Sequence, residues 1–199
     1  DRHGVPQQRS RVFVVGMRSD LAGPEFYDLV LPTSESTMTV RHAIADLPPI
    51  RSGLSKEQDG PEEWMSAIRA ASGAVLKQVR SKSPKAADRM KKAIERMTAR
   101  SRGGEFVAVA KCPKPTEAAR SLQKWLRDDR IGGVLNHASR GHIRSDLARY
   151  LFMASWAGEH GSSPVLSEYP VSLLPDHANV VEARKSRSLA KVSFADRFR

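Results

Sequence analysis

The sequence is poor in cysteine, since Cys112 is the only one among its 199 residues. One thiol can form no internal disulfide and no cysteine-rich zinc site, which favours a reducing compartment, and we expect a cytoplasmic protein. No apolar run approaches the roughly 18 residues of a membrane-spanning helix, and the N-terminus has no apolar signal-peptide core. The chain also begins without methionine, and we expect it to be part of a longer protein.

Negative charge is scarce as well, because 22 Asp and Glu stand against 33 Lys and Arg, a formal net charge of +11. Apolar residues make up 40% of the chain and charged residues 28%, which is ordinary for a folded domain. The cationic excess favours a polyanionic partner, either nucleic acid or an anionic membrane surface. Much of it is local, since residues 80–102 contain nine basic residues and two acidic ones.

The apolar pattern predicts an α+β fold that is mostly helical. Strands are expected at 12–16, 26–32 and 106–110, helices at 41–47, 61–79, 84–100, from 115 to the glycines at 132 and 133, and from 143, and a loop-like tail from 164. Thr39 is expected to cap the helix at 41–47, and the helix at 61–79 carries an apolar stripe of Trp64, Ile68, Ala71, Val75 and Val79. The helices at 61–79 and 84–100 are expected to form a hairpin. Trp64, Trp125 and Trp156 fall on predicted helices, and we expect them in the core rather than stacked on bases.

The segment GVPQQRSRVFVVG, residues 4–16, places Gln7, Arg9 and Arg11 at alternate positions leading into an apolar strand. Alternate residues share one face of a strand, so the two guanidinium groups start roughly 6.6 Å apart. They could bind adjacent phosphates, or one phosphate and a base edge. The alternative is that they pair with acidic side chains of a sheet.

The whole segment resembles a motif of the DNA cytosine-5 methyltransferases. The resemblance implies that Arg9 and Arg11 act as catalytic residues at a DNA phosphate and the flipped target cytosine, and that Gln7 supports this DNA-binding turn. Three later segments are similar to family segments and follow in the same order: TVRHAIADLPP at 39–49, NHASRGHIRSDLARY at 136–150 and FADRFR at 194–199. The resemblance therefore implies that residues 1–50 end a catalytic α/β methyltransferase domain and that residues 51–199 form a helix-rich target-recognition region.

Three motifs of that family are missing: the Pro-Cys nucleophile, the Glu-Asn-Val acid and the Phe-x-Gly-x-Gly cofactor loop. Cys112, which stands in a Lys-Cys-Pro context, is no substitute, and we expect it to be an incidental thiol. We therefore expect the isolated chain to be inactive. The resemblance implies S-adenosyl-L-methionine as cofactor and the rest of the methyltransferase as partner, in the same polypeptide or as a second subunit.

A second candidate site is the basic helix predicted at 84–100. Five basic residues recur in it every three or four positions and should form a cationic face: Lys85, Arg89, Lys92, Arg96 and Arg100. This face would bind DNA phosphates, or alternatively be a solvated helix face. Arg140 and Arg144 are further candidates for phosphate contacts. His137 and His142 lie five residues apart, which does not align them on a helix, so we expect no metal site.

Three functions are compatible with these patterns. The first is DNA binding and target recognition within a cytosine-5 DNA methyltransferase of a bacterial restriction-modification type, acting on duplex DNA at the nucleoid by base flipping. The second is a non-enzymatic basic nucleic-acid-binding module, and the third is a helical protein-interaction domain. DNA binding through phosphates would weaken steeply with salt, which separates the first two functions from the third.

Overall fold

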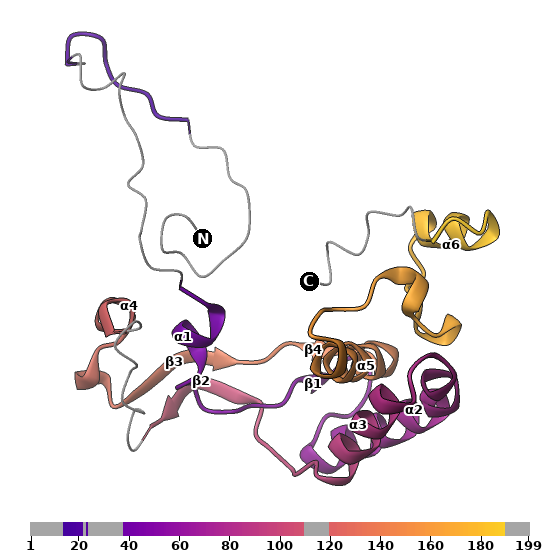
Figure 1. The fold of residues 1–199 in the computed structure, drawn as a ribbon. Helices are drawn as coiled ribbons and strands as arrows, with labels where there is room; N and C mark the ends of the chain where they lie inside the picture. Colours follow the sequence, from indigo (N-terminus) through magenta and orange to yellow (C-terminus); the bar gives the residue numbers. More distant parts are fainter. Residues whose placement is uncertain (1–13, 22, 24–37, 110–119, 190–199) are drawn as a thin grey trace. The chain divides into compact units, whose positions relative to one another are not determined.

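The computed structural model describes residues 14–21, 23, 38–109 and 120–189. Its contacts divide the chain into two units (Figure 1), a first unit of 1–49 and 104–137 and a second unit of 50–103 and 138–199. Helices dominate the described residues and strands are few, which confirms the α+β, mostly helical fold class. None of the described helices is long and apolar enough to cross a bilayer. The proposed remnant of a methyltransferase domain stays a prediction.

The second unit is built on three helices, α2 (Pro61–Lys82), α3 (Pro84–Glu95) and α5 (Arg144–His160). Helix α2 begins with a proline at its first position and two glutamates in its first turn, which favour a helix N-terminus. Ser83 ends α2 and also caps α3, where its Oγ accepts a hydrogen bond of 3.2 Å from the backbone N–H of Ala86. The expected helical hairpin is therefore confirmed, with one residue as its connection.

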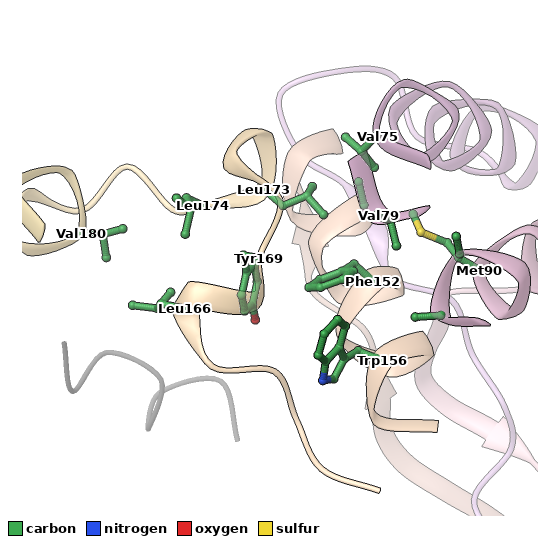
Figure 2. Packing of buried hydrophobic residues seen from close by; sticks show 13 residues of the cluster. Val75, Val79, Met90, Phe152, Trp156, Leu166, Tyr169, Leu173, Leu174 and Val180 are labelled. Carbon is green, nitrogen blue, oxygen red and sulfur yellow. The ribbon is translucent and has the colours of Figure 1, made fainter. Parts of the chain in front are cut away.

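The core of this unit lies where α2, α3 and α5 pack against one another (Figures 1 and 2). Val79, Met90 and Phe152 are fully buried, one from each helix. The ring centroid of Phe152 lies 5.1 Å from that of Tyr169 and 5.7 Å from that of Trp156. The stripe expected on the helix at 61–79 is confirmed at its buried positions Ile68, Val75 and Val79.

Three short helices after α5 complete this core: η4 (Leu166–Glu168), η5 (Val171–Leu173) and α6 (Ala178–Lys185). Each buries one apolar side chain against it, namely Leu166, Leu173 and Val180 (Figure 2). The expectation of a loop-like tail from residue 164 is therefore wrong within 164–189. Helix α6 buries only Val180 and Ala183, too few positions for a periodic pattern in the sequence.

A short parallel pair, β1 (Gly53–Leu54) and β4 (Gly141–His142), joins the segments that lead into α2 and α5. Gly53 lies opposite Gly141, and Leu54 lies opposite His142. A β-carbon at position 141 would lie 3.0 Å from the carbonyl oxygen of Leu54, so this close approach requires glycine. The pairing fixes the place of His142 in the second unit.

In the first unit, α1 (Val40–Ile44) begins at Thr39, whose Oγ1 accepts a hydrogen bond from His42. This confirms the expected cap and helix, although the helix ends at Ile44 rather than at residue 47. The unit also contains α4 (Arg120–Leu126), η3 (Asp129–Ile131) and most of the paired strands β2 (Gly103–Ala108) and β3 (Gly133–Ala138). Arg127 donates to Asp46 through Nε at 2.7 Å and to the carbonyl of Ala43 at 3.1 Å. This pairing lowers the pKa of Asp46.

Two expected elements differ from the structure, and a third cannot be compared with it. Helix α3 ends at Glu95 rather than at residue 100, and beyond it the carbonyl oxygen of Ser101 accepts a 2.9 Å hydrogen bond from the backbone N–H of Arg51. Val14 and Val15 lie in no strand and are exposed, since none of the described strands pairs with them as a buried strand would require. The strand expected at 26–32 lies outside the described residues.

Candidate nucleic-acid interface

Helix α3 has an inner face of Ala86, Ala87 and Met90, all fully buried against the neighbouring helices. Burial of that face turns the opposite side of α3 outward. Four basic residues lie there at steps of four, three and four positions, and we call them the α3 surface: Lys85, Arg89, Lys92 and Arg96. Together with Asp88 and Glu159 they line a hollow of about 460 Å³. The structure thus brings these four predicted site residues together, while Arg100 lies beyond the helix and lines a different hollow.

The α3 surface is less cationic than its sequence indicates, because Glu159 of α5 lies against it. Arg89 donates through Nε to Glu159 at 2.9 Å, and Nζ of Lys85 lies 3.6 Å from the same carboxylate. The hydrogen bond from Arg89, followed by the charge of Lys85, lowers the pKa of Glu159. The expected almost wholly cationic face is corrected on this point, since its compensating carboxylate comes from a helix 70 residues away in the chain.

A glycine on α5 leaves room for the guanidinium of Arg89. A β-carbon at Gly158 would lie 3.2 Å from Nη1 of Arg89, which is tighter than an ordinary contact. The absence of a side chain at position 158 therefore lets Arg89 lie across α5 and reach Glu159.

Ion pairs divide the nine basic residues of 80–102 into two groups. Five are paired with carboxylates: Arg80, Lys85, Arg89, Lys91 and Arg102. Four have no carboxylate within 4 Å among the described residues: Lys82, Lys92, Arg96 and Arg100. Lys92 and Arg96 belong to the α3 surface and are exposed, so they are its strongest candidates for contacts with a polyanion.

Arg140 and Arg144 lie apart from the hollow that the α3 surface lines. Arg140 is exposed in the segment between β3 and β4. Arg144 begins α5, and its Nε lies 3.0 Å from both carboxylate oxygens of Glu57. This pairing lowers the pKa of Glu57, and the hollow that Arg144 lines also includes Glu62 and Glu63. So acidic a setting favours a structural role for Arg144 over a phosphate contact.

A second hollow, of about 520 Å³, lies beside the C-terminal end of α3, and we call it the aromatic hollow. Trp64, His142 and Tyr150 supply its rings, from α2, β4 and α5 respectively. Aliphatic side chains that include Met97 and Leu147 complete its wall, and Arg96 and Arg100 also line it. Sequence reasoning missed this site, because only the tertiary packing brings together rings from three separate segments.

An ion-pair cluster adjoins this hollow, since Arg51 is among the residues that line it. Arg51, only 5% exposed, donates to Asp59 through Nη1 at 2.7 Å, and Arg102 donates to the same carboxylate at 3.1 Å. The backbone N–H of Leu54 donates to Asp59 as well, at 2.9 Å. These bonds, above all the one from Arg51, lower the pKa of Asp59 to about 2. The cluster fixes the backbone of β1 at the base of α2.

The two candidate histidines have ordinary roles in the structure. The ring Nε2 of His137 lies 2.7 Å from the carbonyl oxygen of Pro48, and the ring of His142 meets Tyr150 edge-on at 5.1 Å between centroids. No group of three metal-ligating side chains gathers within the described part of the chain. Gln7, Arg9, Arg11 and Cys112 all lie outside the described residues, so their roles stay predictions.

The three tryptophans differ in burial. Trp156 is buried at 7% exposure, and Trp64 is half-buried, with its ring N–H donated to Oγ of Ser52 at 2.9 Å. Trp125 on α4 is 81% exposed, so the expectation that it belongs to the core is wrong. An amphipathic stripe predicts only which face of a helix can be covered, and in the first unit the described residues leave this face of α4 open.

Comparison with known proteins finds no counterpart for this arrangement. No family model, no curated protein and no solved structure matches the chain. The sequence motifs and the geometry of the two hollows are therefore the basis on which a function can be inferred.

Proposed function

We propose that this chain binds duplex DNA as the target-recognition part of a DNA cytosine-5 methyltransferase. The observation that supports DNA binding most directly is the α3 surface. Helix α3 buries its inner face, while Lys92 and Arg96 on the opposite side are exposed and have no carboxylate partner among the described residues. Cations held on a rigid helix can follow a phosphate backbone at little cost in ordering. The net charge of +11 agrees with such a partner.

The methyltransferase part of the proposal is supported by the motif at residues 4–16. There Arg9 and Arg11 would contact a DNA phosphate and the flipped cytosine. The chain holds no Phe-x-Gly-x-Gly loop and no Pro-Cys nucleophile. The family motif that would hold S-adenosyl-L-methionine is therefore missing from this sequence, and we assign no step of methyl transfer to its residues; in the proposal, that chemistry belongs to the rest of the methyltransferase.

A salt titration with duplex DNA tests the binding role. Each phosphate contact contributes about 0.9 to the slope of log Kobs against log salt, so the variant Lys92→Gln/Arg96→Gln should lower the slope by about 2. The matched control is Arg69→Gln/Lys77→Gln, two exposed cations of α2 that line neither hollow, and it should leave the slope unchanged. Equal slopes for the wild type and the α3 variant would reject the interface.

The coding sequence on either side of these residues separates a methyltransferase from a stand-alone DNA-binding module. We expect Pro-Cys and Glu-Asn-Val motifs to be encoded upstream, in the same reading frame or in an adjacent one. Their absence from both would remove the enzymatic part of the proposal and leave DNA binding intact.

A further inference from the structure

We propose that the aromatic hollow receives an unpaired nucleobase of the bound DNA. The inference rests on the proposed DNA binding and adds to it a site for one base. The hollow, of about 520 Å³, has the volume of a small-molecule site, and its wall combines three rings with aliphatic side chains. Nucleobases bind to protein mainly by stacking on such rings, and every base has the flat face that this requires.

The rings of the hollow are held in place before any ligand arrives. The ring of Trp64 is fixed by its 2.9 Å hydrogen bond to Ser52, and the rings of His142 and Tyr150 meet edge to face. His142 itself is held by the parallel pairing of β4 with β1. Side chains that are already ordered lose little conformational entropy on binding, so little of the binding free energy of a base is offset by the ordering of the site.

The charge around the hollow selects a nucleotide over an uncharged aromatic ligand. Arg96 lines both hollows and so connects the aromatic hollow with the α3 surface, while Arg100 adds a second cation. None of the described residues that line the aromatic hollow is acidic. This distinguishes it from the hollow around Glu57, Glu62 and Glu63, where a phosphate would be repelled.

The length of the α3 surface determines how much of the DNA backbone it would contact and where a base would meet the aromatic hollow. From Lys85 to Arg96 the helix advances by roughly 16 Å at 1.5 Å per residue, about the axial rise of five base pairs. A DNA strand whose phosphates contact the α3 surface would reach Arg96 at the end of the helix, and Arg96 also lines the aromatic hollow. A base that is unstacked from the duplex next to Arg96 would therefore lie beside the aromatic hollow.

Affinity for two DNA duplexes tests the inference, one fully paired and one with a single bulged base. The wild-type chain should bind the bulged duplex about tenfold more tightly, the effect of stacking one base. Tyr150 is 40% exposed, so Tyr150→Ala should leave the fold intact and remove this preference without weakening binding to the paired duplex. Tyr150→Phe keeps the ring and should retain the preference. Trp125→Ala, an exposed ring outside the hollow, is the matched control and should retain it too.

The outcomes separate this inference from the proposed function. Equal affinity of the wild type for both duplexes would overturn the base site and leave DNA binding in place, whereas failure to bind either duplex would overturn both. A preference that survives in Tyr150→Ala would also reject the hollow as the site. As an independent readout, the ring N–H resonance of Trp64, assigned with Trp64→Phe, should shift with the bulged duplex and not with the paired one.

Discussion

The two units of the chain are stabilised in different ways. In the second unit, Phe152, Met90 and Val79 are fully buried in a core shared by three helices. In the first unit, Met38 and Ala43 are the only buried apolar residues among those described. Large apolar side chains are exposed there: Val40, Ile44, Phe106, Trp125 and Leu135. Among the described residues, apolar burial is therefore concentrated in the second unit, while the first unit shows polar contacts such as that of Arg127 with Asp46.

The α3 surface and the aromatic hollow both belong to the second unit, the one with the packed core. A surface that positions cations or rings to within an ångström needs a packed scaffold behind it. Met90 and Leu147 show this directly, since the helices that bury them also present the α3 surface and line the aromatic hollow. Breaking the core should therefore disturb the second unit far more than truncating an exposed ring in the first unit.

The largest effect is expected for Trp156→Ala. The ring is buried and packs against Phe152 at 5.7 Å and against His160 at 4.2 Å between centroids. Truncating a buried aromatic side chain should lower the free energy of unfolding by about 4 kcal/mol. Urea unfolding followed by circular dichroism at 222 nm measures the loss. A change below about 1 kcal/mol would contradict the core described above.

An intermediate effect is expected for Asp59→Asn, which tests whether the second unit also depends on a polar tie. The substitution leaves the guanidinium of Arg51 buried without its counter-charge, and should cost about 3 kcal/mol.

The same carboxylate makes stability depend on pH. Its pKa is lowered in the fold to about 2 from an ordinary value of 3.8, so the stabilisation is fully present above pH 4. It is lost as the pH falls from about 4 to 2. The wild type and Asp59→Asn should therefore converge in urea midpoint over that range. Parallel curves from pH 5 to pH 2 would show that Asp59 is not the titrating group.

The smallest effect is expected for Trp125→Ala, the counterpart of Trp156→Ala in the first unit. Its ring is 81% exposed, so the free energy of unfolding should change by about 0.5 kcal/mol or less. The same urea experiment provides the measurement. A loss of 2 kcal/mol or more would mean that this ring is covered in solution and that the contrast between the units is smaller than described.

Local signals predicted much of the fold. The apolar stripe with Ile68 and Val75 predicted α2, and the cap at Thr39 predicted α1. Both signals are local, since each involves residues within one or two helical turns of one another. Helix α6 was missed, since Val180 and Ala183 are its only buried positions. Trp125 was misplaced because a stripe does not say whether anything covers it.

The candidate site was predicted less well, because it depends on contacts between distant segments. The spacing of Lys85, Arg89, Lys92 and Arg96 correctly placed them together. Nothing near them in the sequence reveals Glu159, which compensates two of them. The aromatic hollow escaped prediction for the same reason, since Trp64 and Tyr150 are 86 positions apart and belong to different helices.

Gly158 affects how much positive charge the α3 surface presents to solvent, because it lies beside Arg89. Nη1 of Arg89 occupies the space that the missing side chain of Gly158 leaves, and Nε of the same guanidinium donates to Glu159. A larger residue at position 158 would release a cation towards a bound polyanion without altering any basic residue. If the proposed DNA binding holds, position 158 would tune its affinity without touching the DNA, so that related chains with the same arginines and lysines would differ in affinity.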